Sequence, residues 1–353
     1  MPPSMYPTRR LGANGPEVSA VGFGAMGMSA YYGKGIDKEQ AFELLTYAAD
    51  RGVTFWDTAS VYGSSEATLG EWFTATGRRS DIFLATKIGK PNYKPGDPMV
   101  LSGSSRPEAI KKSLEHSLKL LQTSWIDLYY QHRVDPDTPI EVVMEALRPY
   151  VEDGTIRYIG LSECSVDVLR RAKAVKGVGD KLIACQMELN PFELEIVKSG
   201  FVDVARELGV GIVAYSPLGR GMITGRYRSK ADFDANDTRT ILPRFSDDNF
   251  NKNLELVDKF GTIAGKYGAT TGQIALAWIL AAYPDFVPIP GSSSVARLEE
   301  NAKAAQIPLG LEDVHALNDA VETADIQGAR YPPGYEQMFI QDCISLEQWQ
   351  KST

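Results

Sequence analysis

Cysteine is scarce in this chain: its 353 residues include three, Cys164, Cys185 and Cys343. An odd number at such wide spacing fits neither a disulfide framework nor a zinc-binding pattern. We therefore expect a protein of a reducing, cytoplasmic compartment, and we expect no metal site.

Long apolar runs and an excess of basic residues are also missing. The most apolar stretch, residues 274–283, spans about ten residues, half of what a helix needs to cross a bilayer. The first ten residues contain no apolar run of the kind found in secretory signals. Lys and Arg number 37 against 45 Asp and Glu, which gives a net charge of −8. Nucleic acids and anionic membranes require a basic surface, so we expect neither as a partner. These features leave the choice between a monomer and a homo-oligomer open.

The chain does contain a regular alternation of short apolar runs and helical patterns. It opens with a predicted hairpin over residues 8–20, in which Asn14-Gly15 supplies the tight turn. Eight strands are predicted, at residues 18–23, 54–57, 82–87, 126–131, 156–161, 182–186, 211–216 and 286–289.

Helices are predicted between these strands from their caps and their apolar spacing. Asp37 precedes a helix that carries Ala41, Leu44 and Ala48 on one face, and Pro139 takes the first position of another. Buried strands that alternate with helices predict a parallel sheet, and eight such units close naturally into a (β/α)8 barrel. An open, doubly wound sheet is the alternative, which the number of strands alone does not exclude.

We expect one domain over residues 1–353, made of the hairpin, a barrel of about residues 18–322 and a C-terminal tail, residues 323–353. Two segments fall outside the alternation. Residues 218–253 form a long stretch with five arginines, and the tail is rich in aromatic residues and proline. Because long loops in compact domains often serve a function, we expect both segments at the mouth of the barrel.

A glycine motif near the N-terminus invites a different interpretation. Gly22-Phe-Gly-Ala-Met-Gly27 matches the dinucleotide-binding pattern G-x-G-x-x-G. That pattern requires a helix to begin at the last glycine, with an acidic residue about 20 positions further on. Here the next helix begins after Asp37, and Asp57 comes too late. We therefore predict a glycine-rich turn above the first barrel strand.

Four polar side chains stand at the ends of the second, third and fourth strands or just beyond: Asp57, Tyr62, Lys87 and His132. In a parallel barrel, the carboxyl ends of the strands form the active site. Asp57, Tyr62 and His132 each have an ordinary structural explanation when taken singly. Lys87, at the end of a buried strand, needs a carboxylate partner, and Asp57 is the obvious one. Together the four predict a proton-transfer site.

This set of groups suits carbonyl reduction. A hydride that reaches a carbonyl carbon leaves charge on oxygen, so a proton donor must lie beside that oxygen. A free tyrosine, with a pKa of about 10, is a weak acid at neutral pH, and an adjacent ammonium lowers such a pKa. We therefore expect Lys87 to lower the pKa of Tyr62, Asp57 to hold Lys87, and His132 to bind the substrate oxygen or to relay the proton.

The stretch Trp56-Asp-Thr-Ala-Ser-Val-Tyr-Gly63, followed by Glu66 and Leu69-Gly70, resembles the signature of the aldo-keto reductases. The similarity covers about residues 8–322, and the family's tetrad falls on Asp57, Tyr62, Lys87 and His132. Segments 218–225 and 243–245 are similar to those of the microbial and plant branch. The resemblance implies an NADPH-dependent oxidoreductase that reduces an aldehyde or ketone to the alcohol, with Tyr62 as general acid.

The resemblance also implies where NADPH or NADP+ binds without a Rossmann fold. Ser162 and Gln186 match positions that hold the nicotinamide carboxamide, and Glu163 stands where many members have asparagine. Tyr215 matches the aromatic ring that stacks on the nicotinamide. Two loops add further positions. The loop after the first strand adds Gly24 and Met26. The loop after the seventh strand adds Ser216, Pro217, Leu218 and Gly219, whose backbone N–H groups would bind the pyrophosphate.

The adenosine end of the cofactor is implied at a separate set of residues: Gly291, Ser292, Ser293, Arg297, Glu300 and Asn301. Serines and an arginine at the start of a helix form a plausible site for the 2′-phosphate that distinguishes NADPH from NADH. Many NADPH-specific members carry a lysine where this chain has Gly291, so use of NADH as well stays open.

Two other functions are compatible with the sequence. The first is a cofactor-sensing regulatory subunit with slow turnover, like the barrel subunits of potassium channels. The second is a lyase or isomerase that forms a Schiff base at Lys87. Met26, Tyr31, Tyr32, Tyr62 and the two long segments are candidates for the substrate pocket, which favours an apolar or aromatic carbonyl compound.

Overall fold

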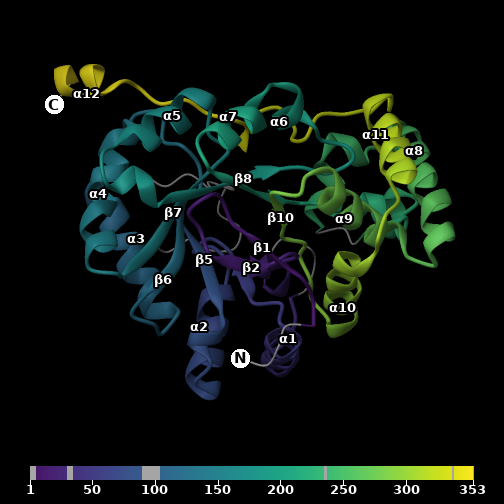
Figure 1. Cartoon of the computed structure of the whole chain (residues 1–353), viewed down its shortest axis with the longest axis horizontal. Helices are drawn as coiled ribbons and strands as arrows, with labels where there is room; N and C mark the ends of the chain where they lie inside the picture. Colours follow the sequence, from purple (N-terminus) through teal and green to yellow (C-terminus); the bar gives the residue numbers. More distant parts are fainter. Residues whose placement is uncertain (1–4, 30–34, 90–103, 234–236, 336–337, 353) are drawn as a thin grey trace.

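A computed structural model describes residues 5–29, 35–89, 104–233, 237–335 and 338–352. Its centre is an eight-stranded sheet whose strands follow one another in chain order, each parallel to the next. The helices lie outside this curled sheet (Figure 1). The strands are β3 (Phe23–Gly24), β4 (Phe55–Asp57), β5 (Phe83–Ile88), β6 (Ile126–Gln131), β7 (Ile156–Ser162), β8 (Leu182–Glu188), β9 (Gly211–Tyr215) and β10 (Phe286–Pro288).

The sheet closes on itself where β3 meets β10. The Gly22 N–H donates to the Pro288 carbonyl at 2.9 Å, and the Gly24 N–H donates to the Pro290 carbonyl at 3.1 Å. Gly24 and Gly291 form a parallel bridge at the same seam. A Cβ atom on Gly24 would lie 2.9 Å from the Ile289 carbonyl oxygen, so this close approach requires a glycine. The predicted (β/α)8 barrel is therefore confirmed, and the open sheet is excluded.

The same seam explains the glycine motif. After β3 the chain forms a single turn of 3-10 helix, η1 (Ala25–Met28), and the next helix, α1 (Lys38–Arg51), begins after Asp37. The Asp37 side chain accepts from the Gln40 N–H and completes a capping box. Gly22 and Gly24 thus serve the closure of the barrel, as expected of a turn above the first strand.

The N-terminal hairpin is confirmed, with β1 (Thr8–Arg10) antiparallel to β2 (Glu17–Ser19). Leu11 and Val18 pack with the side chains that fill the barrel interior, among them Phe55 and Leu128. The hairpin therefore closes one end of the barrel. The predicted strand over residues 18–23 was wrong in its extent, because its first two residues belong to the hairpin and only its last residue, Phe23, belongs to the barrel.

The outer helices bury their apolar faces against the sheet in a second, larger core. They are α1, α2 (Ser65–Thr76), α3 (Pro107–Leu120), α4 (Ile140–Glu152), α5 (Val166–Ala174), α6 (Glu195–Lys198), α7 (Phe201–Glu207), α8 (Asp247–Tyr267), α9 (Thr271–Ala282), α10 (Val295–Lys303), α11 (Leu311–Glu322) and α12 (Leu346–Ser352). In the part of the chain that the structure describes, no helix is both long and apolar enough to cross a membrane.

Two segments cover the carboxyl end of the barrel. Between β9 and α8, the described residues form four short 3-10 helices, namely η4 (Gly219–Thr224), η5 (Lys230–Asp232), η6 (Thr238–Ile241) and η7 (Pro243–Phe245). The C-terminal tail runs from α11 across the molecule to α12 (Figure 1). Backbone hydrogen bonds fix the tail at the end of β7. The Gln341 N–H donates to the Glu163 carbonyl, and the Gln341 carbonyl accepts from the Ser165 N–H, both at 3.0 Å.

Candidate active site

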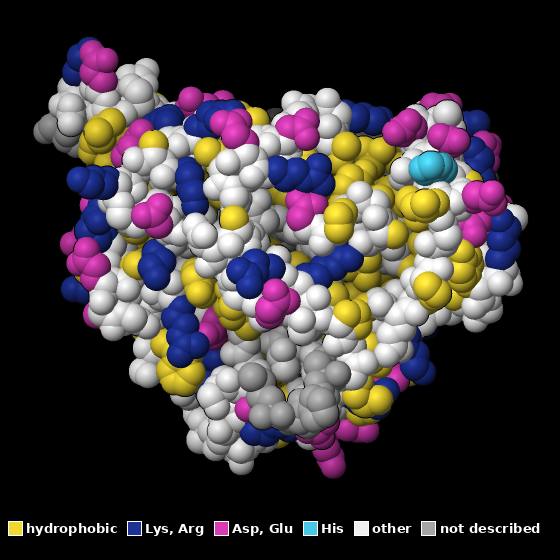
Figure 2. Space-filling view, in the orientation of Figure 1, with side chains coloured by type: hydrophobic (Ala, Val, Ile, Leu, Met, Phe, Trp, Pro, Cys, Tyr) yellow, Lys and Arg dark blue, Asp and Glu magenta, His cyan; other side chains and the backbone are white. Residues whose placement is uncertain are grey.

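A cavity of about 620 Å³ opens at the carboxyl end of the barrel, between the strand ends and the two covering segments. On the face shown in Figure 2, hydrophobic side chains gather in the right half of the view, with Lys and Arg side chains beside them. The covering segments supply much of the apolar wall, as predicted: Leu242 and Phe233 from the segment after β9, and Tyr331, Tyr335 and Met338 from the tail. Tyr31 and Tyr32, also candidates for this wall, lie outside the described residues.

Asp57 and Lys87, at the ends of β4 and β5, form a buried ion pair with an N-to-O distance of 2.5 Å. The Lys87 ammonium also donates to the Thr58 carbonyl at 2.7 Å. The other carboxylate oxygen of Asp57 accepts from the Gln186 side-chain amide at 2.7 Å. Lys87 thus has the carboxylate partner expected of a buried charge. Gln186 both lines the cavity and forms a hydrogen bond with Asp57 of the tetrad.

Tyr62 and His132 face each other at the cavity. Their ring centroids are 5.8 Å apart in an edge-on arrangement, and the Lys87 nitrogen lies 5.0 Å from the centre of the Tyr62 ring. Asp57, Tyr62 and His132 line the cavity, whereas Lys87 is fully buried. The four residues of the predicted tetrad are therefore brought together at one end of the barrel.

The pKa of Tyr62 is raised, whereas the nearness of Lys87 alone led us to expect a lowered pKa. Burial, followed by the nearby Asp57 carboxylate, raises the pKa of Tyr62, while Arg133 acts in the opposite sense. Burial also lowers the pKa of Lys87, against the pull of Asp57. Because Asp57 offsets part of the charge of Lys87, burial outweighs the lysine in setting the pKa of Tyr62. Tyr62 therefore keeps its proton throughout the physiological pH range.

His132 is buried beside two cations, and its imidazole is neutral. Burial lowers the pKa of His132 well below its usual value, and Lys87 and Arg133 lower it further. Its Nδ1 atom is buried with no hydrogen-bond partner in the structure. A neutral imidazole has one N–H to donate, so His132 can act as a hydrogen-bond donor toward the cavity.

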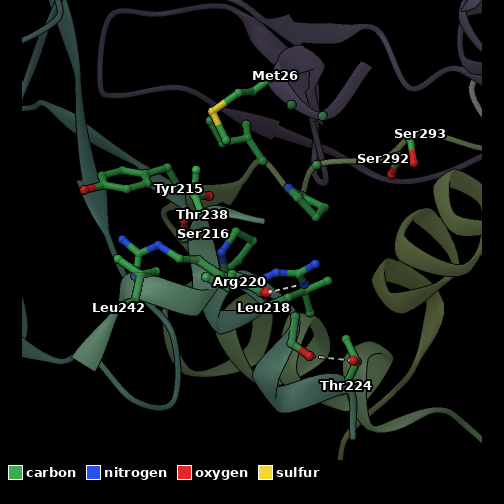
Figure 3. Close-up of a pocket in the computed structure, with 18 of the residues that line it drawn as sticks. Met26, Tyr215, Ser216, Leu218, Arg220, Thr224, Thr238, Leu242, Ser292 and Ser293 are labelled. Carbon is green, nitrogen blue, oxygen red and sulfur yellow. Dashed lines mark hydrogen bonds between the residues drawn. The ribbon is translucent and has the colours of Figure 1, made fainter. Parts of the chain in front are cut away.

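The residues matched to the nicotinamide and the pyrophosphate of the cofactor divide into two groups. Gly24, Met26, Gln186, Tyr215, Ser216, Pro217 and Leu218 line the cavity, and Figure 3 shows Met26 and Tyr215 at one side of it. Ser162 and Gly219 do not line it: Ser162 is buried and accepts from Arg133 at 3.1 Å, and the Gly219 N–H donates to the Ser216 carbonyl. In this structure that N–H is engaged within the turn.

The residues matched to the adenosine end all line the cavity: Gly291, Ser292, Ser293, Arg297, Glu300 and Asn301. Ser294 caps α10 by accepting from the Arg297 N–H. The Arg297 guanidinium donates to Ser293 at 3.3 Å, and the Asn301 amide donates to Ser292 at 3.0 Å. Ser292 and Ser293 lie across the cavity from Tyr215 (Figure 3).

Sequence reasoning missed a buried cluster of arginine and glutamate residues at the rim of the cavity. Arg330, from the tail, donates to Glu163 at 2.9 Å and to Glu188 at 3.0 Å. Arg220 also pairs with Glu188, at 3.0 Å. Burial opposes ionisation of Glu188, but the surrounding arginines lower its pKa to about 2. The Glu163 carboxylate, at the position where many members of the family have asparagine, is thus held by the tail.

Sequence reasoning also missed Arg133, which lines the cavity beside His132. It is 4% exposed, and its Nη1 atom donates to the His132 carbonyl at 2.7 Å. A signal for it existed, because Arg133 directly follows His132 at the end of a buried strand. Like Lys87, Arg133 is a charged side chain at the end of a buried strand, and such a group needs a partner for its charge. Among the described residues, no group of three or more His, Cys, Asp or Glu side chains is placed to hold a metal ion.

Comparison with known proteins agrees with this geometry. The model of the aldo/keto reductase family matches residues 20–322. The chain is 47% identical over 333 residues to "Aldo-keto reductase yakc [NADP(+)]" of Schizosaccharomyces pombe, covering 93% of this chain and 95% of that protein. It is 46% identical over 332 residues to "Aldo-keto reductase str7" of Strobilurus tenacellus, covering 92% and 94%.

A solved structure leads to the same conclusion. The crystal structure of a thermostable aldo-keto reductase with the inhibitor epalrestat is similar at a TM-score of 0.71 and 29% identity, over 89% of this chain and 99% of that one. The family match spans the barrel, and the relatives cover nearly the whole chain. With a closed barrel and four polar residues gathered at its carboxyl end, this chain belongs to the aldo/keto reductase family.

Proposed function

We propose that this protein reduces an aldehyde or a ketone to the alcohol, with NADPH as the reductant and Tyr62 as the proton donor. The observation that carries the proposal is the grouping of Tyr62, His132 and the buried Asp57–Lys87 pair at a cavity with an apolar wall. The family membership supports the class of reaction, and the name of the yeast relative, which includes NADP(+), supports the cofactor.

The cavity has the polar groups that a phosphorylated dinucleotide needs. At one side, Ser292, Ser293 and Arg297 gather around the N-terminus of α10, where hydroxyls, a guanidinium and the helix dipole favour a phosphate. At the other side, the partly buried Tyr215 ring offers a flat apolar surface. These residues would hold the 2′-phosphate and the nicotinamide, respectively. When bound, NADPH supplies the hydride.

The tetrad residues supply binding and a proton. The Tyr62 hydroxyl and the neutral His132 imidazole donate hydrogen bonds to the substrate carbonyl oxygen, which orients the carbonyl and favours negative charge on oxygen. The Tyr62 proton then passes to that oxygen. With its raised pKa, Tyr62 stays protonated until the alkoxide forms, and because an alkoxide is a stronger base than a phenolate, it can still take the proton.

Asp57 and Lys87 act on the position and charge of Tyr62. Lys87 lies against the Tyr62 ring, and Asp57, held by Gln186, fixes the ammonium. As a phenolate forms during proton transfer, the fixed ammonium stabilises it without any movement of the protein. The apolar residues from the covering segments exclude water and favour an apolar or aromatic carbonyl compound.

The test is Tyr62→Phe, assayed by NADPH oxidation across a panel of aromatic and aliphatic aldehydes and ketones. We expect turnover to fall by about 1,000-fold, within the usual range for loss of a general acid, while NADPH binding, followed by fluorescence, stays near that of the unaltered protein. Tyr158→Phe, in β7 against Phe83, is the matched control for loss of a hydroxyl.

The outcomes separate the competing functions. Loss of NADPH binding in Tyr62→Phe would count against the proposed role of the hydroxyl. An unaltered protein that binds NADPH but turns over no member of the panel would favour the regulatory subunit. Covalent trapping of a carbonyl compound on Lys87 by borohydride would favour the Schiff-base enzyme.

A further inference from the structure

Among the described residues, four arginine side chains are buried, and one of them differs from the rest. Arg79 pairs with Asp127 at 2.7 Å, Arg239 with Asp237 at 2.6 Å, and Arg330 with Glu163 at 2.9 Å. Arg133 is equally buried, yet none of the described carboxylates lies within 4.0 Å of its guanidinium.

The Arg133 guanidinium is held firmly, but by neutral groups. Its Nη1 atom donates to the His132 carbonyl at 2.7 Å and to the Ser162 hydroxyl at 3.1 Å. Its Nε atom is buried and has no hydrogen-bond partner among the residues that the structure describes. The carbon at the centre of the guanidinium lies 5.9 Å from the centre of the Tyr215 ring. Arg133 therefore presents a fixed positive charge to the cavity, beside Tyr62 and His132 of the proposed tetrad.

A buried charge without a counter-ion costs several kcal/mol, so an anion is expected beside it. The nearby carboxylates do not fill this role, because Asp57 is paired with Lys87 and Glu163 with Arg330. The groups suited to the 2′-phosphate, at Ser292 and Ser293, lie across the cavity from Tyr215 (Figure 3), the ring near Arg133. An anion carried by a substrate at the tetrad would meet the charge of Arg133.

We propose that Arg133 binds a carboxylate carried by the substrate, so that the preferred substrates are carbonyl compounds with both an apolar or aromatic frame and a carboxylate. The planar guanidinium forms two parallel hydrogen bonds with a carboxylate, which fixes orientation as well as adding affinity. His132, the preceding residue, faces the carbonyl in the proposed reaction. Adjacent residues thus hold the two ends of one substrate.

This inference rests on the proposed function, and the test compares two aldehydes that differ in charge. 4-Carboxybenzaldehyde and its methyl ester have the same aromatic frame and the same reacting group. For the unaltered protein and for Arg133→Met, kcat/KM is measured with each aldehyde at saturating NADPH. We expect the ratio of kcat/KM for the acid to that for the ester to fall at least tenfold in Arg133→Met, and Arg133→Lys to recover part of it.

Two controls make this result specific. Arg226→Met removes an exposed arginine that also lines the cavity, and the acid-to-ester ratio should stay within twofold of the unaltered value. The KM for NADPH is measured in every variant. An equal loss of activity toward both aldehydes in Arg133→Met, or a rise in the KM for NADPH without a change in the ratio, would overturn the proposal.

A second measurement does not depend on turnover. Binding of 4-methylbenzoate and of 4-methylbenzamide is measured by calorimetry on the protein saturated with NADP+. We expect the benzoate to bind at least tenfold more weakly to Arg133→Met, with a smaller change for the amide; equal changes would overturn the role of Arg133. Benzoate binding that depends on Arg133, in a protein that reduces no aldehyde, would instead contradict the proposed function.

Discussion

The Arg330 guanidinium donates a hydrogen bond to the Tyr215 hydroxyl, with an N-to-O distance of 2.8 Å. Tyr215 ends β9, and Arg330 belongs to the C-terminal tail. The Tyr215 hydroxyl in turn donates to Glu163 at 2.8 Å, which Arg330 also binds. The tail therefore fixes the ring that forms one side of the cavity.

Removal of the Arg330 charge should affect both stability and cofactor binding. In Arg330→Met, Glu163 and Glu188 lose a buried cation, and we expect the free energy of unfolding to fall by about 3 kcal/mol. The KM for NADPH should rise more than kcat falls, because the Tyr215 ring loses its support. Denaturant unfolding and steady-state kinetics measure the two effects.

Arg330→Lys is the conservative partner of this variant and keeps the charge without the planar fork. It should recover most of the stability and part of the affinity for NADPH. A loss of stability with no change in the KM for NADPH would show that the tail stabilises the fold but does not position Tyr215.

Glu66 makes the stability of the protein depend on pH. It is buried in α2, where its carboxyl accepts from the Thr86 hydroxyl at 2.6 Å, and burial raises its pKa to about 7. In the unfolded chain a glutamate has a pKa of about 4.3. Between these two values the unfolded chain releases a proton that the folded protein keeps. The free energy of unfolding therefore falls as the pH rises from about 4.3 to about 7.

Glu66→Gln removes this ionisation and keeps a polar group of similar size. We compare the free energy of unfolding of this variant with that of the unaltered protein at two pH values. The difference, variant minus unaltered protein, should be larger at pH 8 than at pH 5 by about 2 kcal/mol. Glu43→Gln, at an exposed position of α1, is the control and should show no such difference. An equal effect of Glu66→Gln at both pH values would contradict the raised pKa.

Arg297 is expected to select between the two nicotinamide cofactors. Its guanidinium lies at the start of α10 beside Ser293, and NADPH differs from NADH by the 2′-phosphate alone. A charge-assisted hydrogen bond contributes about 1.5–3 kcal/mol. Arg297→Ala should therefore raise the KM for NADPH about tenfold or more, with little change in the KM for NADH.

The control for this prediction is Lys303→Ala, at the other end of the same helix. It removes one positive charge from α10 and should change neither Michaelis constant appreciably. Equal increases for NADPH and NADH in Arg297→Ala would assign the residue to a part of the cofactor that both share.

The barrel and the tetrad were predictable because each depends on local signals. Asp57, Lys87 and His132 are polar residues at the ends of apolar runs, and parallel strands bring such ends together. Arg133 gives the same signal and was overlooked. The strand predicted over residues 18–23 failed because an apolar pattern does not show where a chain passes from one sheet to another.

The cluster around Arg330 could not be predicted in the same way. Its partners Glu163 and Glu188 lie 167 and 142 residues away in the chain, and no periodicity connects them. The pKa of Tyr62 depends on a balance between burial and several neighbouring charges. The charged residues can be found in the sequence, but the size of each one's effect on the pKa of Tyr62 depends on distances that only a three-dimensional structure provides.

The residues proposed to react with the substrate and the apolar residues that cover the cavity come from different stretches of the chain. The proposed proton-transfer residues lie between positions 57 and 132, whereas Tyr331, Tyr335 and Met338 come from the tail that follows the last barrel helix. Mutations in these final residues therefore change which molecules enter without altering the groups that react with them. Selection can act on the two properties separately, and an engineer can exchange Tyr331, Tyr335 and Met338 while Arg330 keeps its contacts with the barrel.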